Sequence, residues 1–178
     1  MPISAKAFGT PSEYLVLDER CYLRPLTVED VTDAYVAGMQ DPEVIQFLIG
    51  PRRIPQTRAT VTEFVLQNQN QPHQIVFGIY IDGELRGTVR LHDLTAGGVA
   101  WIGTAIFDRD YWGQGWSFRC LALACAWAIR ERGVIAIRAG IEPGNQRSRK
   151  AFARAGFTPE ETWNMPDGYE VDIWTHRP

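Results

Sequence analysis

The chain has 178 residues, a formal net charge of -3, 45% hydrophobic residues and 22% charged residues. This length suits a single domain with its own core, and the small negative charge excludes a surface that attracts nucleic acid wholesale. No segment approaches the roughly 20 apolar residues of a membrane span, and the start has no signal-peptide core. We therefore expect a cytoplasmic protein with neither a nucleic-acid nor a membrane partner.

The N-terminal part of the chain is predicted to contain a strand pair and two helices. A β-hairpin or one long bent strand is predicted over Tyr14–Asp18 and Cys21–Leu26. Thr27 then has the position of a helix-capping residue. The apolar spacing that follows predicts a helix over Val28–Met39 and a short helix over Glu43–Leu48.

The middle of the chain is predicted to form a helix and three strands. The helix is expected over Thr57–Gln69, where apolar residues recur at helical spacing. Strands over Ile75–Ile81 and Leu85–Leu91 are predicted to form a hairpin, because the Asp82-Gly83 pair between them favours the positive φ angles of a two-residue turn. A third strand is predicted over Val99–Phe107.

The last part of the chain is predicted to alternate helices and strands. An apolar helix is expected over about Phe118–Arg132, followed by a buried strand over Val134–Ile141. A basic helix over Gln146–Arg154 and a last strand over Val171–Thr175 complete the chain. This order predicts one α/β domain with a mixed sheet over residues 13–178, after an N-terminal extension of residues 1–12.

The three cysteines are expected to be free. Cys21, Cys120 and Cys125 are odd in number and lack CxxC spacing, and two of them fall in the apolar helix. Buried thiols in a reducing compartment are therefore predicted, and no metal site is expected.

The loop before the apolar helix has the composition of an anion site. Gly113 and Gly115 lack a Cβ, so backbone can approach a phosphate, and the unpaired N–H groups of the next helical turn point at it. A dinucleotide motif is excluded because Phe118 stands where the third glycine belongs, and a P-loop is excluded because no Gly-Lys-Ser/Thr is present. A simple capping turn is the alternative for this glycine pair taken alone.

Three linked motifs resemble the coenzyme-A-binding core of the GNAT acetyltransferase superfamily, and most closely its ribosomal-protein-alanine acetyltransferase branch. They are the strand Ile102–Ile106, the loop Tyr111–Ser117, and the segment Pro143–Ser148 with Ala155-Gly156-Phe157. The resemblance implies a mostly antiparallel sheet, flanked by helices and splayed between its fourth and fifth strands, with the cofactor in the opening. It also implies acetyl-CoA as co-substrate, no metal, and acetyl transfer to an amine.

The family pattern also implies which residues bind the cofactor. The strand edge would hydrogen-bond the pantetheine arm, the glycine loop would hold the diphosphate, and the asparagine of the last motif would reach the pantetheine from the other side. The expected cofactor-binding residues are Thr104, Ala105, Ile106, Phe107, Trp112, Gly113, Gln114, Gly115, Trp116, Ser117 and Asn145.

Two residues depart from the family pattern. Arg119 stands where the branch commonly has a carboxylate, and it could approach the diphosphate, face the acceptor or lie on the surface. Phe152 stands where many members have a tyrosine that returns a proton to the coenzyme-A thiolate, which phenylalanine cannot do. Ser148, one turn earlier, is our candidate to hydrogen-bond the thiolate, and capping of the helix is its alternative role.

A base is expected near the acceptor, because an amine must lose a proton before it attacks a thioester. His92 and Glu43 are candidates for this role, together with Asp93, Asp108 and Asp110. The sequence does not rank them.

The acceptor is predicted to be a small-molecule amine such as an amino sugar on a nucleotide carrier. Asp41–Val44 and Gly168–Asp172 resemble segments of branch members that acetylate such sugars. A protein N-terminal amine is the alternative acceptor. A non-catalytic acyl-CoA-binding module is the alternative of a different class, and a homodimer is left open.

Overall fold

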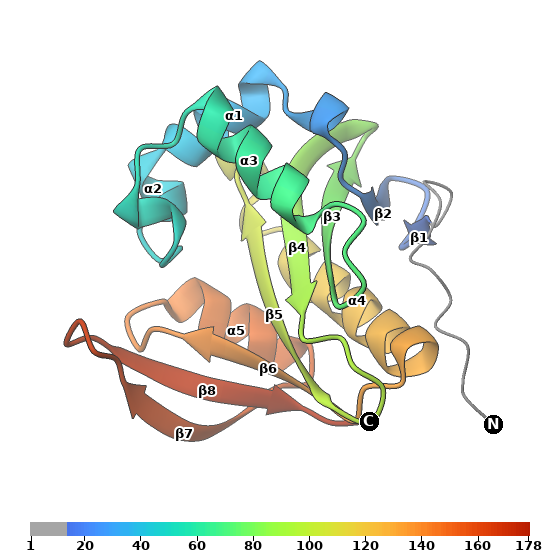
Figure 1. The fold of residues 1–178 in the computed structure, drawn as a ribbon, viewed down its shortest axis with the longest axis vertical. Helices are drawn as coiled ribbons and strands as arrows, with labels where there is room; N and C mark the ends of the chain where they lie inside the picture. The colour runs from blue at the N-terminus through green and yellow to red at the C-terminus, as the bar shows by residue number, and fades with distance from the viewer. Residues whose placement is uncertain (1–13) are drawn as a thin grey trace.

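Within residues 14–178, a single sheet of eight strands forms the centre of the structure (Figure 1). The strands are β1 (Leu15–Val16), β2 (Cys21–Pro25), β3 (Gln74–Ile81), β4 (Glu84–His92), β5 (Val99–Ile106), β6 (Ala136–Ile141), β7 (Thr158–Asn164) and β8 (Glu170–His176). The computed structural model describes residues 14–178, so the expected N-terminal extension lies outside the described residues. Their order in the sheet is β1-β2-β3-β4-β5-β6-β8-β7, and all neighbours except β5 and β6 are antiparallel. The predicted α/β fold with a mixed, mostly antiparallel sheet is confirmed.

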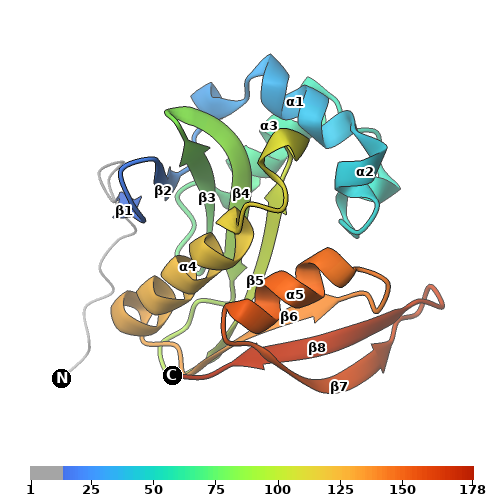
Figure 2. The same cartoon turned by 180° about the vertical axis from the view of Figure 1, so that it is seen from behind.

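Helices cover both faces of this sheet. They are α1 (Asp33–Gln40), α2 (Pro42–Ile45), α3 (Arg58–Asn68), α4 (Trp116–Arg132) and α5 (Gln146–Arg154). The first three lie over one face and α4 lies over the other (Figure 2). Each face has its own apolar core, one around Leu121 of α4 and the other around Tyr35 of α1 and Val65 of α3. No helix among residues 14–178 is long and apolar enough to cross a membrane.

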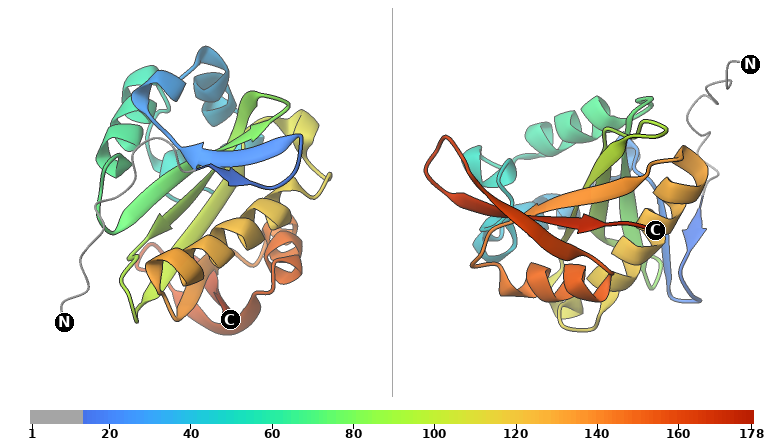
Figure 3. Two further views of the ribbon diagram at one scale, coloured as in Figure 1. Left: turned by 90° about the vertical axis from the view of Figure 1, so that its right-hand side faces the viewer. Right: turned by 90° about the horizontal axis from the view of Figure 1, so that it is seen from below.

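The sheet opens between β5 and β6. These strands run parallel and pair only between Val99–Trp101 and Ala136–Arg138. Figure 3 shows β6, β7 and β8 running across the direction of β3, β4 and β5. The predicted opening between the fourth and fifth strands is therefore present, and it lies one strand later because the N-terminal segment forms a hairpin of two strands. This opening positions the candidate site.

The first α-helix begins later than predicted. Residues 28–30 form a 3-10 turn, and α1 starts only after Thr32. The cause is Asp30, whose carboxylate accepts hydrogen bonds from Arg24 and, at 2.6 Å, from the Tyr80 hydroxyl. This polar network holds Asp30 against the sheet, so the chain turns once before it continues as α1.

Most other predicted elements agree with the structure to within a few residues. The hairpin of β3 and β4 turns at Asp82 and Gly83, whose φ angles are 53° and 81°, as the two-residue turn requires. The helix α4 ends before Gly133, and α5 has its predicted bounds. The three cysteines are buried and free, as expected.

Candidate active site

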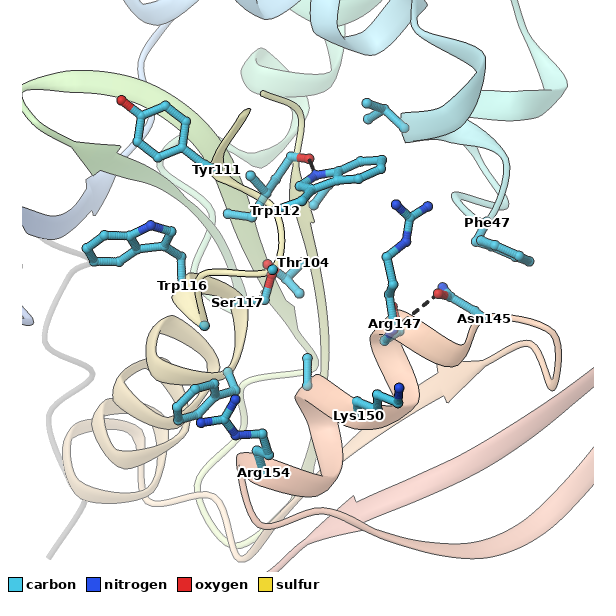
Figure 4. Close-up of a pocket in the computed structure, with 18 of the residues that line it drawn as sticks. Phe47, Thr104, Tyr111, Trp112, Trp116, Ser117, Asn145, Arg147, Lys150 and Arg154 are labelled. Carbon is cyan, nitrogen blue, oxygen red and sulfur yellow. Dashed lines mark hydrogen bonds between the residues drawn. The ribbon is translucent and has the colours of Figure 1, made fainter. Parts of the chain in front are cut away.

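A cavity of about 330 Å³, here called the first cavity, lies where β5 and β6 diverge. Its walls are the strand β5, the helix α5 and the loop that precedes α4. The segment around Phe47 closes one side (Figure 4). All but two of the predicted cofactor-binding residues line it. They are Thr104, Ala105, Ile106, Trp112, Gly113, Gly115, Trp116, Ser117 and Asn145.

Two predicted cofactor-binding residues lie outside this lining. Phe107 is buried in the core beside α1, where its ring centre is 4.8 Å from that of Tyr35. Gln114 holds the loop itself, because its Nε2 donates to the Asp110 carbonyl at 2.7 Å and its Oε1 accepts from the Trp116 indole at 3.3 Å. Their side chains support the walls of the first cavity rather than line it.

The loop before α4 presents backbone N–H groups to the first cavity. Gly113 and Gly115 have φ angles of 74° and 85°, which favour glycine. The first N–H groups of α4 have no partner within the helix, and no described side chain caps them. A Cβ on Gly115 would lie 2.9 Å from Cε1 of Phe118, so a larger residue would require the Phe118 ring to move. The free N–H groups and the positive end of the helix dipole form a site for a phosphate.

The strand β5 has a free backbone edge in this cavity. One edge pairs with β4, where Ala105 lies opposite Thr88. The other edge has no strand partner beyond Trp101 within the part of the chain that the structure describes. The indole N–H of Trp112 donates to the Ile106 carbonyl at 2.7 Å and ties the loop to the end of the strand. An extended ligand with amide groups can bind along this edge as an added strand would.

Three cations of α5, namely Arg147, Lys150 and Arg154, line the first cavity (Figure 4). The guanidinium of Arg147 lies 3.8 Å from the ring centre of Trp112, and that of Arg154 lies 3.8 Å from the ring centre of Phe118. None of the three forms an ion pair with a described carboxylate, so their charge is available to an anionic ligand. The sequence marks α5 as basic, and its i, i+3, i+7 spacing is the signal that could have assigned them to the site.

A second cavity of about 870 Å³ lies on the other side of β5. It is bounded mainly by apolar and aromatic side chains of α1, α3, the segment after α2, β5 and the β7–β8 hairpin. Phe47, Leu48, Thr104 and Ala105 line both cavities. The two cavities therefore meet at β5, where a group bound in one can reach a molecule bound in the other.

Among the predicted bases, His92 alone lines the second cavity. Burial and the nearby charge of Arg90 lower the pKa of its imidazole below the usual value near 6.5, against the opposing effect of Asp93. The Nδ1 atom of His92 lies 3.3 Å from Oδ2 of Asp93. His92 is therefore neutral at pH 7, and a neutral imidazole can accept a proton.

The other predicted bases lie elsewhere. Glu43 is exposed at the edge of the first cavity. Asp108 forms an ion pair with Arg86 at 2.7 Å, and Asp93 and Asp110 line neither cavity. The structure thus brings one predicted base to each cavity.

The helix α5 brings Asn145 and Ser148 to the first cavity. Oδ1 of Asn145 accepts the N–H of Ser148 at 3.2 Å, so Asn145 is the capping residue. The Ser148 hydroxyl faces no described hydrogen-bond partner. Phe152 is 4% exposed and packs edge-on against Phe157 with ring centres 5.0 Å apart. Because Phe152 points into the core, its missing hydroxyl leaves no gap in the first cavity.

Arg119 lines neither cavity. Its guanidinium forms an ion pair with Asp18, in the turn between β1 and β2, and lies 5.1 Å from the ring centre of Trp116. The hydrogen bond from Arg119 is the main cause that lowers the pKa of Asp18. Arg119 therefore joins α4 to the N-terminal hairpin, and its predicted alternatives at the diphosphate or the acceptor do not fit.

The opened sheet, the free strand edge and the phosphate site together define an α/β protein that binds an extended, phosphate-bearing co-substrate. Residues 20–158, most of the chain, match the family described as the acetyltransferase (GNAT) domain. The chain therefore belongs to the GNAT acetyltransferase family, as its motifs predicted. No curated protein sequence matches it significantly.

Solved acetyltransferases share this fold. RimL, a ribosomal L7/L12 alpha-N-protein acetyltransferase in complex with coenzyme A, has a TM-score of 0.81 at 17% identity over 93% of this chain and 98% of that one. AAC(6')-Ib in complex with ribostamycin and coenzyme A has a TM-score of 0.75 at 18% identity over 89% and 94%. A GNAT acetyltransferase from Bacillus anthracis has a TM-score of 0.80 at 16% identity over 93% and 98%. Coenzyme A in the first two agrees with the predicted co-substrate.

Proposed function

We propose that this acetyltransferase moves the acetyl group of acetyl-CoA to a primary amine bound in the second cavity, by direct attack. The observation that carries this proposal is the meeting of the two cavities at Thr104 and Ala105 of β5. Two substrates held on opposite sides of this strand react without a covalent enzyme intermediate, because their approach is already fixed.

The residues of the first cavity suit acetyl-CoA, which supplies a thioester when bound. The N–H groups after Gly115 and the cations Arg147, Lys150 and Arg154 suit its phosphate groups. The free edge of β5 suits the amides of its pantetheine arm. No lysine of the loop is needed, because backbone N–H groups face the anion.

Proton transfer falls to side chains from both cavities. His92, neutral at pH 7, takes the proton of the attacking amine directly or through a water molecule. Ser148 donates a hydrogen bond to the thiolate that leaves when the carbon–sulfur bond breaks. Glu43 is the second candidate base, at the edge of the first cavity.

The second cavity suits a small-molecule acceptor. Its volume of about 870 Å³ falls in the range of roughly 300 to 1,000 Å³ that is typical of ligand sites. An amino sugar on a nucleotide carrier remains our proposed class, because the cavity has aromatic walls at Trp101 and Trp163 for a base to stack on. A protein N-terminal amine is the alternative. The homodimer and the cytoplasmic location stay predictions.

Thiol release from acetyl-CoA tests this function. The panel contains nucleotide-linked amino sugars, amino acids, polyamines, aminoglycosides and N-terminal peptides, with binding of acetyl-CoA measured in parallel. Turnover of a small amine supports the proposal, and turnover of peptides alone moves the acceptor to protein N-termini. Tight binding of acetyl-CoA without turnover across the panel contradicts catalysis and favours a non-catalytic module.

A further inference from the structure

One cation in the second cavity forms no ion pair with a described carboxylate. Arg90 of β4 is partly buried there and forms no ion pair within residues 14–178. Its Nε donates to Oδ1 of Asn68 at 2.9 Å, and its Nη2 donates to Oε1 of Gln74 at 3.3 Å. Both partners are neutral amides. Burial lowers the pKa of Arg90, and the charge of Asp93 opposes this effect. The lowered pKa reflects the cost of burying this cation without a paired anion.

The other ionisable groups of this cavity leave the charge of Arg90 available. Glu63 is the carboxylate in its described lining, but Glu63 is exposed and its Oε1 accepts a hydrogen bond from Gln67 at 3.0 Å. His92 is held neutral. The cavity therefore presents one unpaired positive group among mainly apolar walls, and it attracts an anion more strongly than a second cation.

Open space adjoins Arg90. Its cross-strand partner on β5 is Gly103, and a Cβ placed on Gly103 would meet no atom within 4 Å. Cross-strand partners project from the same face of a sheet, so the Arg90 side chain leaves β4 on the face that borders this space, and both residues line the second cavity. Trp101 and Trp163, whose ring centres are 5.6 Å apart, form an aromatic wall of the same cavity.

We propose that the acceptor amine carries an anionic oxygen group, carboxylate or phosphate, which binds Arg90, and an apolar or aromatic part that packs against Trp101 and Trp163. A guanidinium suits this role because its N–H donors are fixed in a fork that matches such oxygens. The inference rests on the proposed function, since it names the class of acceptor. It disfavours polyamines and aminoglycosides, whose charges Arg90 repels.

Matched acceptors that differ in the anionic group test this proposal. L-phenylalanine and L-phenylalaninamide share an amine and a ring but differ in the carboxylate. A nucleoside-diphosphate amino sugar and the free amino sugar form the pair for phosphate. In at least one pair we expect kcat/KM to be roughly tenfold to a hundredfold higher for the anionic member. Equal or better use of the neutral member in both pairs overturns the proposal.

Two variants test whether Arg90 causes the preference for the anionic acceptor. Arg90→Gln removes the charge, and Asn68→Asp neutralises it by placing a carboxylate on the hydrogen-bond partner of Nε. Assayed at about pH 8, where His92 stays neutral even without the nearby charge of Arg90, both variants should raise KM for the anionic member about tenfold or more and leave KM for the neutral member little changed. Acetyl-CoA affinity should persist, because neither residue lines the first cavity. A similar loss for both members, in both variants, contradicts a role in recognition.

Measurements of acceptor binding test this inference even if the protein proves not to catalyse acetyl transfer. If no amine is turned over, calorimetry with coenzyme-A-saturated protein and the same acceptor pairs still tests the site. Preferential binding of the anionic member, lost in Arg90→Gln, supports the anion site even though transfer fails. Equal binding of both members, or no binding of either, overturns it.

Discussion

The indole N–H of Trp112 donates to the backbone carbonyl of Ile106 at 2.7 Å, and the same ring lies 3.8 Å from the guanidinium of Arg147. One side chain therefore connects the end of β5, the glycine loop and α5. These three elements form the walls of the first cavity, so their relative position depends on Trp112.

Trp112→Phe keeps an aromatic ring, although a smaller one, and removes the hydrogen bond to Ile106. We expect the dissociation constant of coenzyme A to rise about threefold to tenfold, the value of one hydrogen bond of roughly 1 kcal/mol. Isothermal titration calorimetry measures this change. The matched control is Trp163→Phe, in the second cavity, which should leave it unaltered. The same loss in both variants would mean that Trp112 acts only through general stability.

Gly115→Glu should abolish coenzyme A binding, because it places a bulky anion where phosphate is expected and leaves 2.9 Å between Cβ and the Phe118 ring. Gly97→Glu is the control, since Gly97 also has a positive φ, 75°, but faces open space away from both cavities. Both variants lose about 1 to 2 kcal/mol from left-handed backbone strain. Retained affinity in Gly115→Glu, measured by calorimetry, would remove the loop from the site.

Arg147→Gln should weaken coenzyme A binding about fivefold at low salt, because an unpaired cation is lost from the first cavity. The difference in coenzyme A affinity between the variant and the wild type should shrink at high salt, since salt screens the interactions of exposed charges. Arg130→Gln removes an exposed cation from α4 outside both cavities and serves as the control. A salt-independent difference, or an equal effect of both variants, would contradict a direct role for Arg147.

His92 sets the expected pH dependence of acetyl transfer. An imidazole acts as a base only when it is neutral, and the pKa of His92 is lowered, so kcat/KM should stay constant down to about pH 6.5 and fall only below it. His92→Gln should lower kcat/KM roughly a hundredfold and remove this acid limb, while acetyl-CoA affinity stays unchanged. An identical pH profile in the variant would exclude His92 as the base and leave Glu43→Gln as the next test.

Asp30→Ala should destabilise the fold by about 3 kcal/mol, because it leaves Arg24 and the buried Tyr80 hydroxyl without their acceptor. Urea unfolding measures this loss. Asp33→Ala is the control, since that carboxylate is fully exposed and its ion pair with Arg58 should contribute little. A negligible effect at Asp30 would mean that the network does not hold the start of α1 in place.

The sequence was sufficient for the elements whose signals are local. Asp82 and Gly83 specify a turn through their own backbone preferences, and the periodicity of α5 and its asparagine cap set its bounds. The linked strand, glycine-loop and asparagine motifs likewise predicted most of the first cavity, because each lies in a continuous segment. The start of α1 was missed because Asp30 is held by Tyr80, a residue distant in sequence.

Only the tertiary structure decided which polar side chains contact each other and which of them line a cavity. From the sequence, one predicted role for Arg119 was to approach the diphosphate. In the folded protein it forms an ion pair with Asp18 instead. The sequence did not rank the candidate bases. In the structure, the pleat of β4 places the side chains of His92 and Arg90 on the face that lines the second cavity. The physical reason is that composition and spacing fix which face of an element is apolar, whereas the partner of a polar side chain depends on segments brought together by folding.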